Sequence, residues 1–174
     1  MNEPTFITQA KAALAEHCAE PIEAVLLVHP TGRRKKVFGR KHLASRLHIN
    51  NYLVITTGHV RLFGLGGRTG LKVRDELAGW PRSQVRAQVE MAERSSYFAS
   101  TGSHLDYRTF CVHLTGPDLD LSVDVRADAG LFSDDLDFLE QDAPEVQEAI
   151  EGLKEEASAT SDAVQAFVRA LTPA

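Results

Sequence analysis

The fold of this chain is decided by residues 52–63, YLVITTGHVRLF, in which two strand-like runs are separated by Thr57 and Gly58. The runs cover residues 52–56 and 59–63, and a two-residue connection between such runs suits a tight β-hairpin. We therefore predict an antiparallel hairpin here and place the other elements relative to it.

Alternation of apolar and polar residues predicts further strands after the hairpin. Residues 84–91, 110–114 and 118–126 carry an apolar side chain at every second position, the pattern of a strand with one solvated face. A Gly-Pro pair at 116–117 marks a turn between the last two runs, which predicts an antiparallel pair. We expect the apolar side chains at every second position from 53 through 125 to face a common interior.

Two further strands are predicted from weaker signals. Residues 23–29 include four consecutive apolar side chains, VLLV, which indicates a strand buried on both faces. A strand is also expected at about residues 70–78. The glycines at 64, 66, 67 and 70 are expected to form a loop between this strand and the hairpin.

Helices are predicted at both ends of the chain. An amphipathic pattern within residues 1–20 predicts a helix that continues to about Ala19 and ends before Pro21. After Gly130 the apolar period becomes helical, which predicts a helix that covers the sheet and an acidic extension. The predicted organisation is an N-terminal helix (1–20), a β domain with its covering helix (21–141) and an extended acidic C-terminal helix (142–174).

Composition indicates one globular domain without a membrane span. The chain has 174 residues, of which 43% are hydrophobic and 25% charged, enough for one core. The longest wholly apolar run, Ala24 to Val28, is far shorter than the roughly 20 residues that span a bilayer. Glu3 and Pro4 stand where a secretory signal would carry basic and apolar residues, so a cytoplasmic location is expected. The two cysteines, Cys18 and Cys111, are expected to be free thiols.

The order of these elements resembles the bacterial pleckstrin-homology-like (PH-like) family. The resemblance is carried by the hairpin at 52–63, by Trp80-Pro-Arg-Ser-Gln-Val85 before the next strand, and by the paired strands at 108–115 and 119–126 that lead into a helix. It spans about residues 22–141. It implies an α+β, mainly β fold: a bent antiparallel barrel of about seven strands, one open end of which is capped by a C-terminal helix.

Charge is strongly segregated along the chain, whose net charge is −5. Residues 1–30 carry one basic and four acidic side chains, residues 31–126 carry sixteen and eight, and residues 127–174 carry two and twelve. The positive charge of residues 31–126 is densest between the first and second predicted strands, at Arg33, Arg34, Lys35, Lys36, Arg40, Lys41 and Arg46.

Clustered cations on a loop attract phosphates, anionic membrane surfaces or nucleic acid. In PH domains the corresponding loop often holds phosphoinositide headgroups, so the resemblance implies an anion site there. A solvated loop that pairs with the acidic helix of the same chain is the alternative.

No motif predicts catalysis, a metal or a cofactor. The glycine run at 64–70 lacks the strand-then-helix context and the lysine of nucleotide-binding loops. Cys111 and His113 are two ligand types for zinc, but a site needs three or four converging ligands. Ser103, His104 and Asp106 are adjacent in sequence rather than held in relay geometry. These residues are interpreted as loop and strand-surface positions, and the protein as a non-enzyme.

The C-terminal extension carries one continuous apolar stripe. Its residues recur at alternating spacings of three and four, which suits either packing on the chain's own sheet or a helical seam for homodimerisation. The candidate association residues are Val146, Ile150, Leu153, Val164, Phe167 and Leu171.

The sequence therefore favours a non-enzymatic binding or assembly module that contacts a protein partner or a second copy of itself. Recognition of an anionic, phosphate-bearing ligand, a lipid headgroup or nucleic acid, through residues 33–46 is the alternative.

Overall fold

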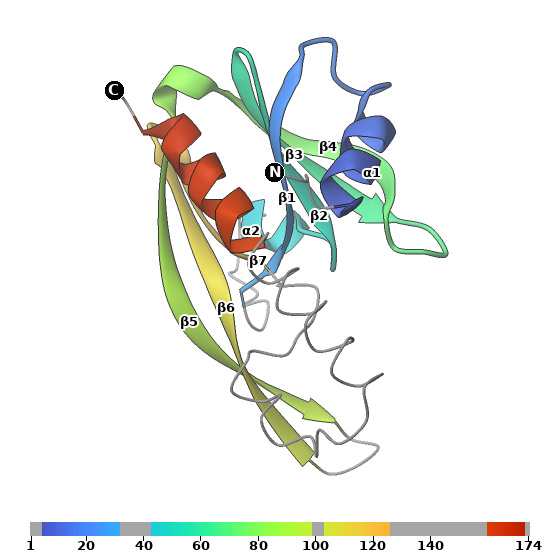
Figure 1. Cartoon of the computed structure of the whole chain (residues 1–174), viewed down its shortest axis with the longest axis vertical. Helices are drawn as coiled ribbons and strands as arrows, with labels where there is room; N and C mark the ends of the chain where they lie inside the picture. The colour runs from blue at the N-terminus through green and yellow to red at the C-terminus, as the bar shows by residue number, and fades with distance from the viewer. Residues whose placement is uncertain (1–4, 32–42, 99–102, 126–159, 173–174) are drawn as a thin grey trace, which may run out of the picture.

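The computed structural model describes residues 5–31, 43–98, 103–125 and 160–172 (Figure 1). Seven antiparallel strands form one sheet in the order β4-β3-β2-β1-β7-β6-β5. The elements are α1 (Thr5–Leu14), β1 (Ile22–Pro30), α2 (Leu43–Arg46), β2 (Asn51–Thr56), β3 (His59–Gly66), β4 (Lys72–Pro81), η1 (Arg82–Gln84), β5 (Arg86–Phe98), β6 (Ser103–Gly116), β7 (Leu119–Val125) and a C-terminal helix over residues 160–171.

The main core lies on the inner face of the bent sheet. Side chains from every strand meet there, as alternation predicted, and the C-terminal helix adds its own apolar face to them. The largest fully buried members are Leu26, Leu47, Leu53, Ile55, Leu62, Leu114, Leu121 and Phe167.

A second core lies on the outer face of β1 to β4, where α1 covers the sheet. Ala10 and Leu14 of α1 pack there with Val54 and Phe63. Every residue of β2 is consequently buried. The two helices lie on opposite sides of the sheet in Figure 1, α1 in blue and the C-terminal helix in red.

β5 and β6, which form a hairpin, are longer than the other strands, with 13 and 14 residues. The register of the hairpin pairs Arg86 with Thr115 at one end and Phe98 with Ser103 at the other. In Figure 1 it projects as a two-stranded ribbon beyond the rest of the sheet. Met91 faces the inner side of this ribbon, yet it is 51% exposed because it lies past the packed interior.

Three expectations need correction. In the described residues β4 and β5 form free edges of the sheet, so the predicted barrel is open. The N-terminal helix ends at Leu14 rather than near Ala19, and a short turn follows it. The glycine segment is also partly strand, because β3 continues to Gly66 and pairs with β4.

Gly64 shows why a glycine occupies the strand. A Cβ atom at Gly64 would lie 2.7 Å from the imidazole ring of His48, which also contacts the carbonyl oxygen of Leu65 through Nδ1 at 2.8 Å. The glycine is therefore used for close approach of a side chain rather than for a turn.

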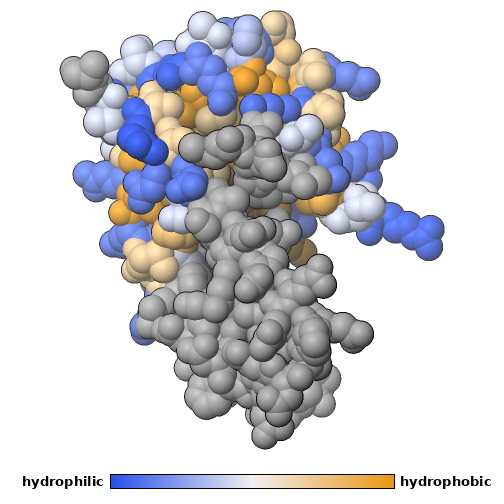
Figure 2. All heavy atoms as spheres, in the orientation of Figure 1, coloured by the Kyte–Doolittle hydropathy of each residue, from blue (hydrophilic) through white to orange (hydrophobic). Residues whose placement is uncertain are grey.

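The space-filling view shows mostly polar side chains on the surface of the described residues, with apolar atoms between them (Figure 2). Among the described helices, none is long and apolar enough to cross a bilayer.

Candidate functional sites

One end of the sheet carries a group of cations that we call the basic rim: Arg46, Arg68, Lys72 and Arg74. Arg46 ends α2, and the other three belong to the β3–β4 connection and the start of β4. The two segments are joined by a hydrogen bond from Asn50 Nδ2 to the carbonyl oxygen of Gly70, at 3.1 Å. The rim is therefore built on two adjacent, mutually braced segments.

The cations of the basic rim are available to a ligand. All four are exposed, and no ion pair joins any of them to another residue in the part of the chain that the structure describes. Of the nearby acidic side chains, Glu76 pairs with Arg61 at 2.9 Å, whereas the exposed carboxylate of Asp75 lies 3.9 Å from Nε2 of His48, an ion pair only when that imidazole is protonated. Glu76 is thus neutralised by Arg61, and the four cations of the rim keep an excess of positive charge beside the single carboxylate of Asp75.

Two exposed apolar side chains lie beside the basic rim. Ile49 is 79% exposed and Leu71 is 39% exposed. They are the chain neighbours of Asn50 and Gly70, the residues that join the two segments. Two apolar side chains next to four cations that have no ion-pair partner among the described residues form a surface suited to an anionic and partly apolar partner.

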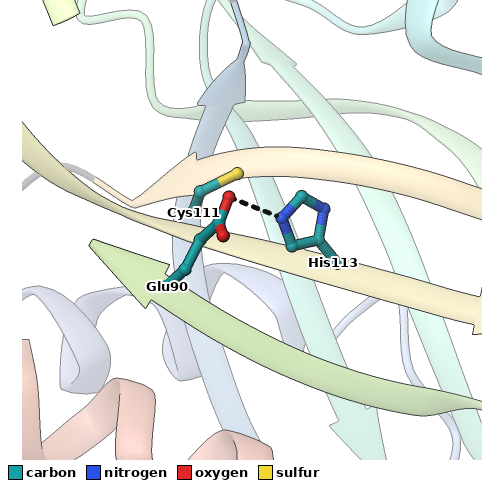
Figure 3. Close-up of side chains that lie close together, drawn as sticks. All are labelled: Glu90, Cys111 and His113. Atoms are coloured by element: carbon teal, nitrogen blue, oxygen red, sulfur yellow. Dashed lines mark hydrogen bonds and ion pairs between the residues drawn. The ribbon is translucent and has the colours of Figure 1, made fainter. Parts of the chain in front are cut away.

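A second polar group lies on the outer face of β5, β6 and β7. Glu90 on β5 is directly opposite Cys111 on β6, and His113 lies two residues further along β6. The Nε2 atom of His113 lies 3.0 Å from Oε1 of Glu90, and its Nδ1 atom lies 2.6 Å from Oγ of Ser122 on β7. Figure 3 shows the Glu90, Cys111 and His113 side chains lying close together, with the Glu90–His113 interaction dashed.

The thiol of Cys111 is buried among charged groups rather than in an apolar core. Cys111 is 2% exposed and faces Asp124 of β7, which is 5% exposed. Asp124 accepts two hydrogen bonds from Arg94, at 2.8 and 3.0 Å. Burial raises the pKa of the Cys111 thiol to about 11, and the carboxylate of Asp124 adds to the shift.

The structure places the sequence-predicted candidates differently. Of the predicted anion-binding residues only Arg46 is described, and it belongs to the basic rim. Val164, Phe167 and Leu171 are buried in the main core, so these three positions of the stripe pack on the chain's own sheet. The remaining candidates lie outside the described residues: Arg33, Arg34, Lys35, Lys36, Arg40, Lys41, Val146, Ile150 and Leu153.

Sequence reasoning missed two contributions to these sites. The charge pattern includes Arg68, Lys72 and Arg74 in the positive excess of residues 31–126, but it does not place them near Arg46, because that depends on the contact between Asn50 and Gly70. Glu90 was recognised as a strand residue, but only the register of β5 and β6 places it opposite Cys111. Both cysteines are free thiols, as predicted.

Comparison with protein-family models, with curated proteins and with solved structures finds no match to this chain.

Proposed function

We propose that this chain is a non-enzymatic binding module of PH-like fold that docks on an anionic membrane surface through its basic rim. The PH-like assignment is supported by an antiparallel sheet in the order β4-β3-β2-β1-β7-β6-β5 and by a C-terminal helix packed on its inner face. The two free thiols are compatible with the reducing cytoplasm, the location included in this proposal.

The observation that carries the docking proposal is the combination of unpaired cations with exposed apolar side chains. Arg46, Arg68, Lys72 and Arg74 offer electrostatic attraction worth about 1 kcal/mol each near an anionic bilayer. Ile49 and Leu71 favour a membrane over nucleic acid, since aliphatic side chains gain free energy in the acyl boundary but do not stack on bases. Residues 33–41, which belong with Arg46 to the connection between β1 and β2, would contribute six further cations.

The test measures cosedimentation of the full chain with vesicles of phosphatidylcholine, with and without phosphatidylserine or a phosphoinositide. We expect binding only to the anionic vesicles, and weaker binding as salt rises. The double variant Arg68→Gln, Lys72→Gln removes two cations and should weaken binding roughly 30-fold, the equivalent of about 2 kcal/mol.

Matched controls separate this site from overall charge. Arg86→Gln with Arg169→Gln removes the same charge from exposed positions on β5 and the C-terminal helix and should leave binding unchanged. Equal weakening by both double variants, or tighter binding to a single-stranded oligonucleotide than to vesicles, would contradict membrane docking by the rim.

A second candidate function, protein association, is favoured by the edge of β5. This strand is 13 residues long and ends the sheet, so part of its backbone can pair with a strand from another chain. Met91, which is half exposed on the same strand, offers apolar contact area there. We include self-association or a protein partner in the proposal on this ground.

A further inference from the structure

We propose that Glu90, Cys111 and His113 bind a divalent zinc ion on the outer face of the β5–β7 part of the sheet. Their ligand atoms, a carboxylate oxygen, a thiol sulfur and an imidazole nitrogen, all lie within 4.8 Å of one another. This site is separate from the basic rim and does not depend on the function proposed for it.

The donor set selects the metal. Zinc prefers nitrogen and sulfur ligands and accepts carboxylate oxygen, whereas magnesium and calcium prefer oxygen alone. With zinc–ligand bonds of about 2.0 to 2.3 Å, ligand atoms in a tetrahedral site lie about 3.5 Å apart. Oε1 of Glu90 and Nε2 of His113 already lie 3.0 Å apart, and no pair among the three ligand atoms is more than 4.8 Å apart, so rotations of the side chains, led by the exposed Glu90, are enough to bring them to that spacing.

A neighbouring residue already orients the His113 ligand. Ser122 contacts Nδ1 of His113, so a ring that donates its Nδ1 hydrogen to this hydroxyl keeps the Nε2 lone pair for a metal. Nε2 is also the atom that faces Glu90. A zinc ion bound at Nε2 displaces the direct contact between His113 and Glu90, and a proton carried on Nε2 leaves to solvent.

The position of Cys111 fits the same arrangement. Its register with Glu90 fixes both side chains on one face, and β5 and β7 flank it on either side. Zinc binding expels the thiol proton to solvent, because the thiolate is the ligand form. Three protein ligands leave a fourth tetrahedral position for water.

The test uses the full chain, freed of any polyhistidine tag and of bound metal. Titration with Co²⁺ should give one equivalent of binding and a thiolate-to-cobalt charge-transfer band, which Zn²⁺ then removes by displacement. The variant Cys111→Ser should lose the band, whereas Cys18→Ser, which changes the other cysteine, should keep it. Absence of the band in the wild-type chain, or its loss in Cys18→Ser instead, would overturn the proposal.

Glu90 and His113, which are not buried, provide a second test in which the buried Cys111 is left unchanged. His113→Gln and Glu90→Gln should each weaken Zn²⁺ affinity at least tenfold, measured by competition with a chromogenic chelator. Ser122→Ala should weaken it by roughly tenfold, because it orients the imidazole without contacting the metal. His17→Gln and Glu93→Gln are the matched controls, and circular dichroism verifies the fold of each variant. Unchanged affinity in both ligand variants would refute the site.

Discussion

At the scale of single residues, Glu20 illustrates how one side chain fixes a turn. It accepts hydrogen bonds from the hydroxyl of Thr56 and, at 3.2 Å, from the backbone N–H of Gly58, and its Oε1 lies 2.9 Å from Nδ1 of His59. These interactions, led by the Thr56 and Gly58 hydrogen bonds, lower the pKa of Glu20 from 4.5 to about 2. The carboxylate therefore ties the segment before β1 to the β2–β3 turn.

This pKa shift predicts the acid dependence of stability. Above pH 4.5 the carboxylate is charged in both states, so its native interactions contribute fully to the free energy of unfolding. As the pH falls from about 4.5 towards 2, the unfolded chain takes up a proton that the folded chain does not, and the contribution is lost. Glu20→Gln should lower the melting temperature at pH 7 and flatten its fall between pH 5 and 2.

Thermal unfolding followed by circular dichroism at a series of pH values provides the measurement. Glu16→Gln, at an exposed position in the turn after α1, is the matched control and should keep the wild-type pH dependence. A Glu20→Gln curve parallel to that of the wild-type chain would contradict the role assigned to this carboxylate.

At the scale of elements, the C-terminal helix is part of the main core. Phe167 lies on the side of this helix that faces the sheet and is fully buried. The C-terminal end of the helix is bound by Arg82, whose Nη2 donates a hydrogen bond to the carbonyl oxygen of Ala170 at 3.1 Å. Phe167→Ala should lower the free energy of unfolding by about 3–5 kcal/mol, since it removes a buried aromatic ring and leaves a cavity.

Urea unfolding measures this cost. Gln165→Ala, two residues away on the exposed side of the same helix, should change the free energy of unfolding by less than about 0.5 kcal/mol. A similar small effect for Phe167→Ala would mean that the helix adds little to the core.

Strand positions were well predicted where the alternation of apolar and polar residues was bounded by turn-forming residues. The hairpin of β2 and β3 and the pairing of β6 with β7 follow from alternation and from short turns. The second core beneath α1 was predicted only in part. The run VLLV correctly indicates that β1 is buried on both faces, but residues of β2 alternate between two apolar faces, and periodicity cannot distinguish one buried face from two. The sites depend on pairing registers, which a single sequence does not encode locally.

At the scale of the whole molecule, the open edge of β5 predicts concentration-dependent association. Met91→Lys places a charge on the exposed apolar side of this strand and should shift the average mass measured by light scattering towards the monomer. Gln88→Lys adds the same charge to an exposed position of β5 and is the control, which should leave the mass unchanged. A wild-type chain that stays monomeric at all concentrations would contradict association through this edge.

The strand order also constrains how the protein comes to be folded. β1 pairs with β7, with His29 opposite Asp124 and Pro30 opposite Val123, so this pairing can form only after β7 has been synthesised. When two strands are far apart in sequence, closing the loop between them costs entropy before their contacts can stabilise the pair, and this slows folding. The part formed by α1 and β1 to β4 is thus able to fold early, while its inner face stays uncovered until β5 to β7 and the C-terminal helix have been synthesised.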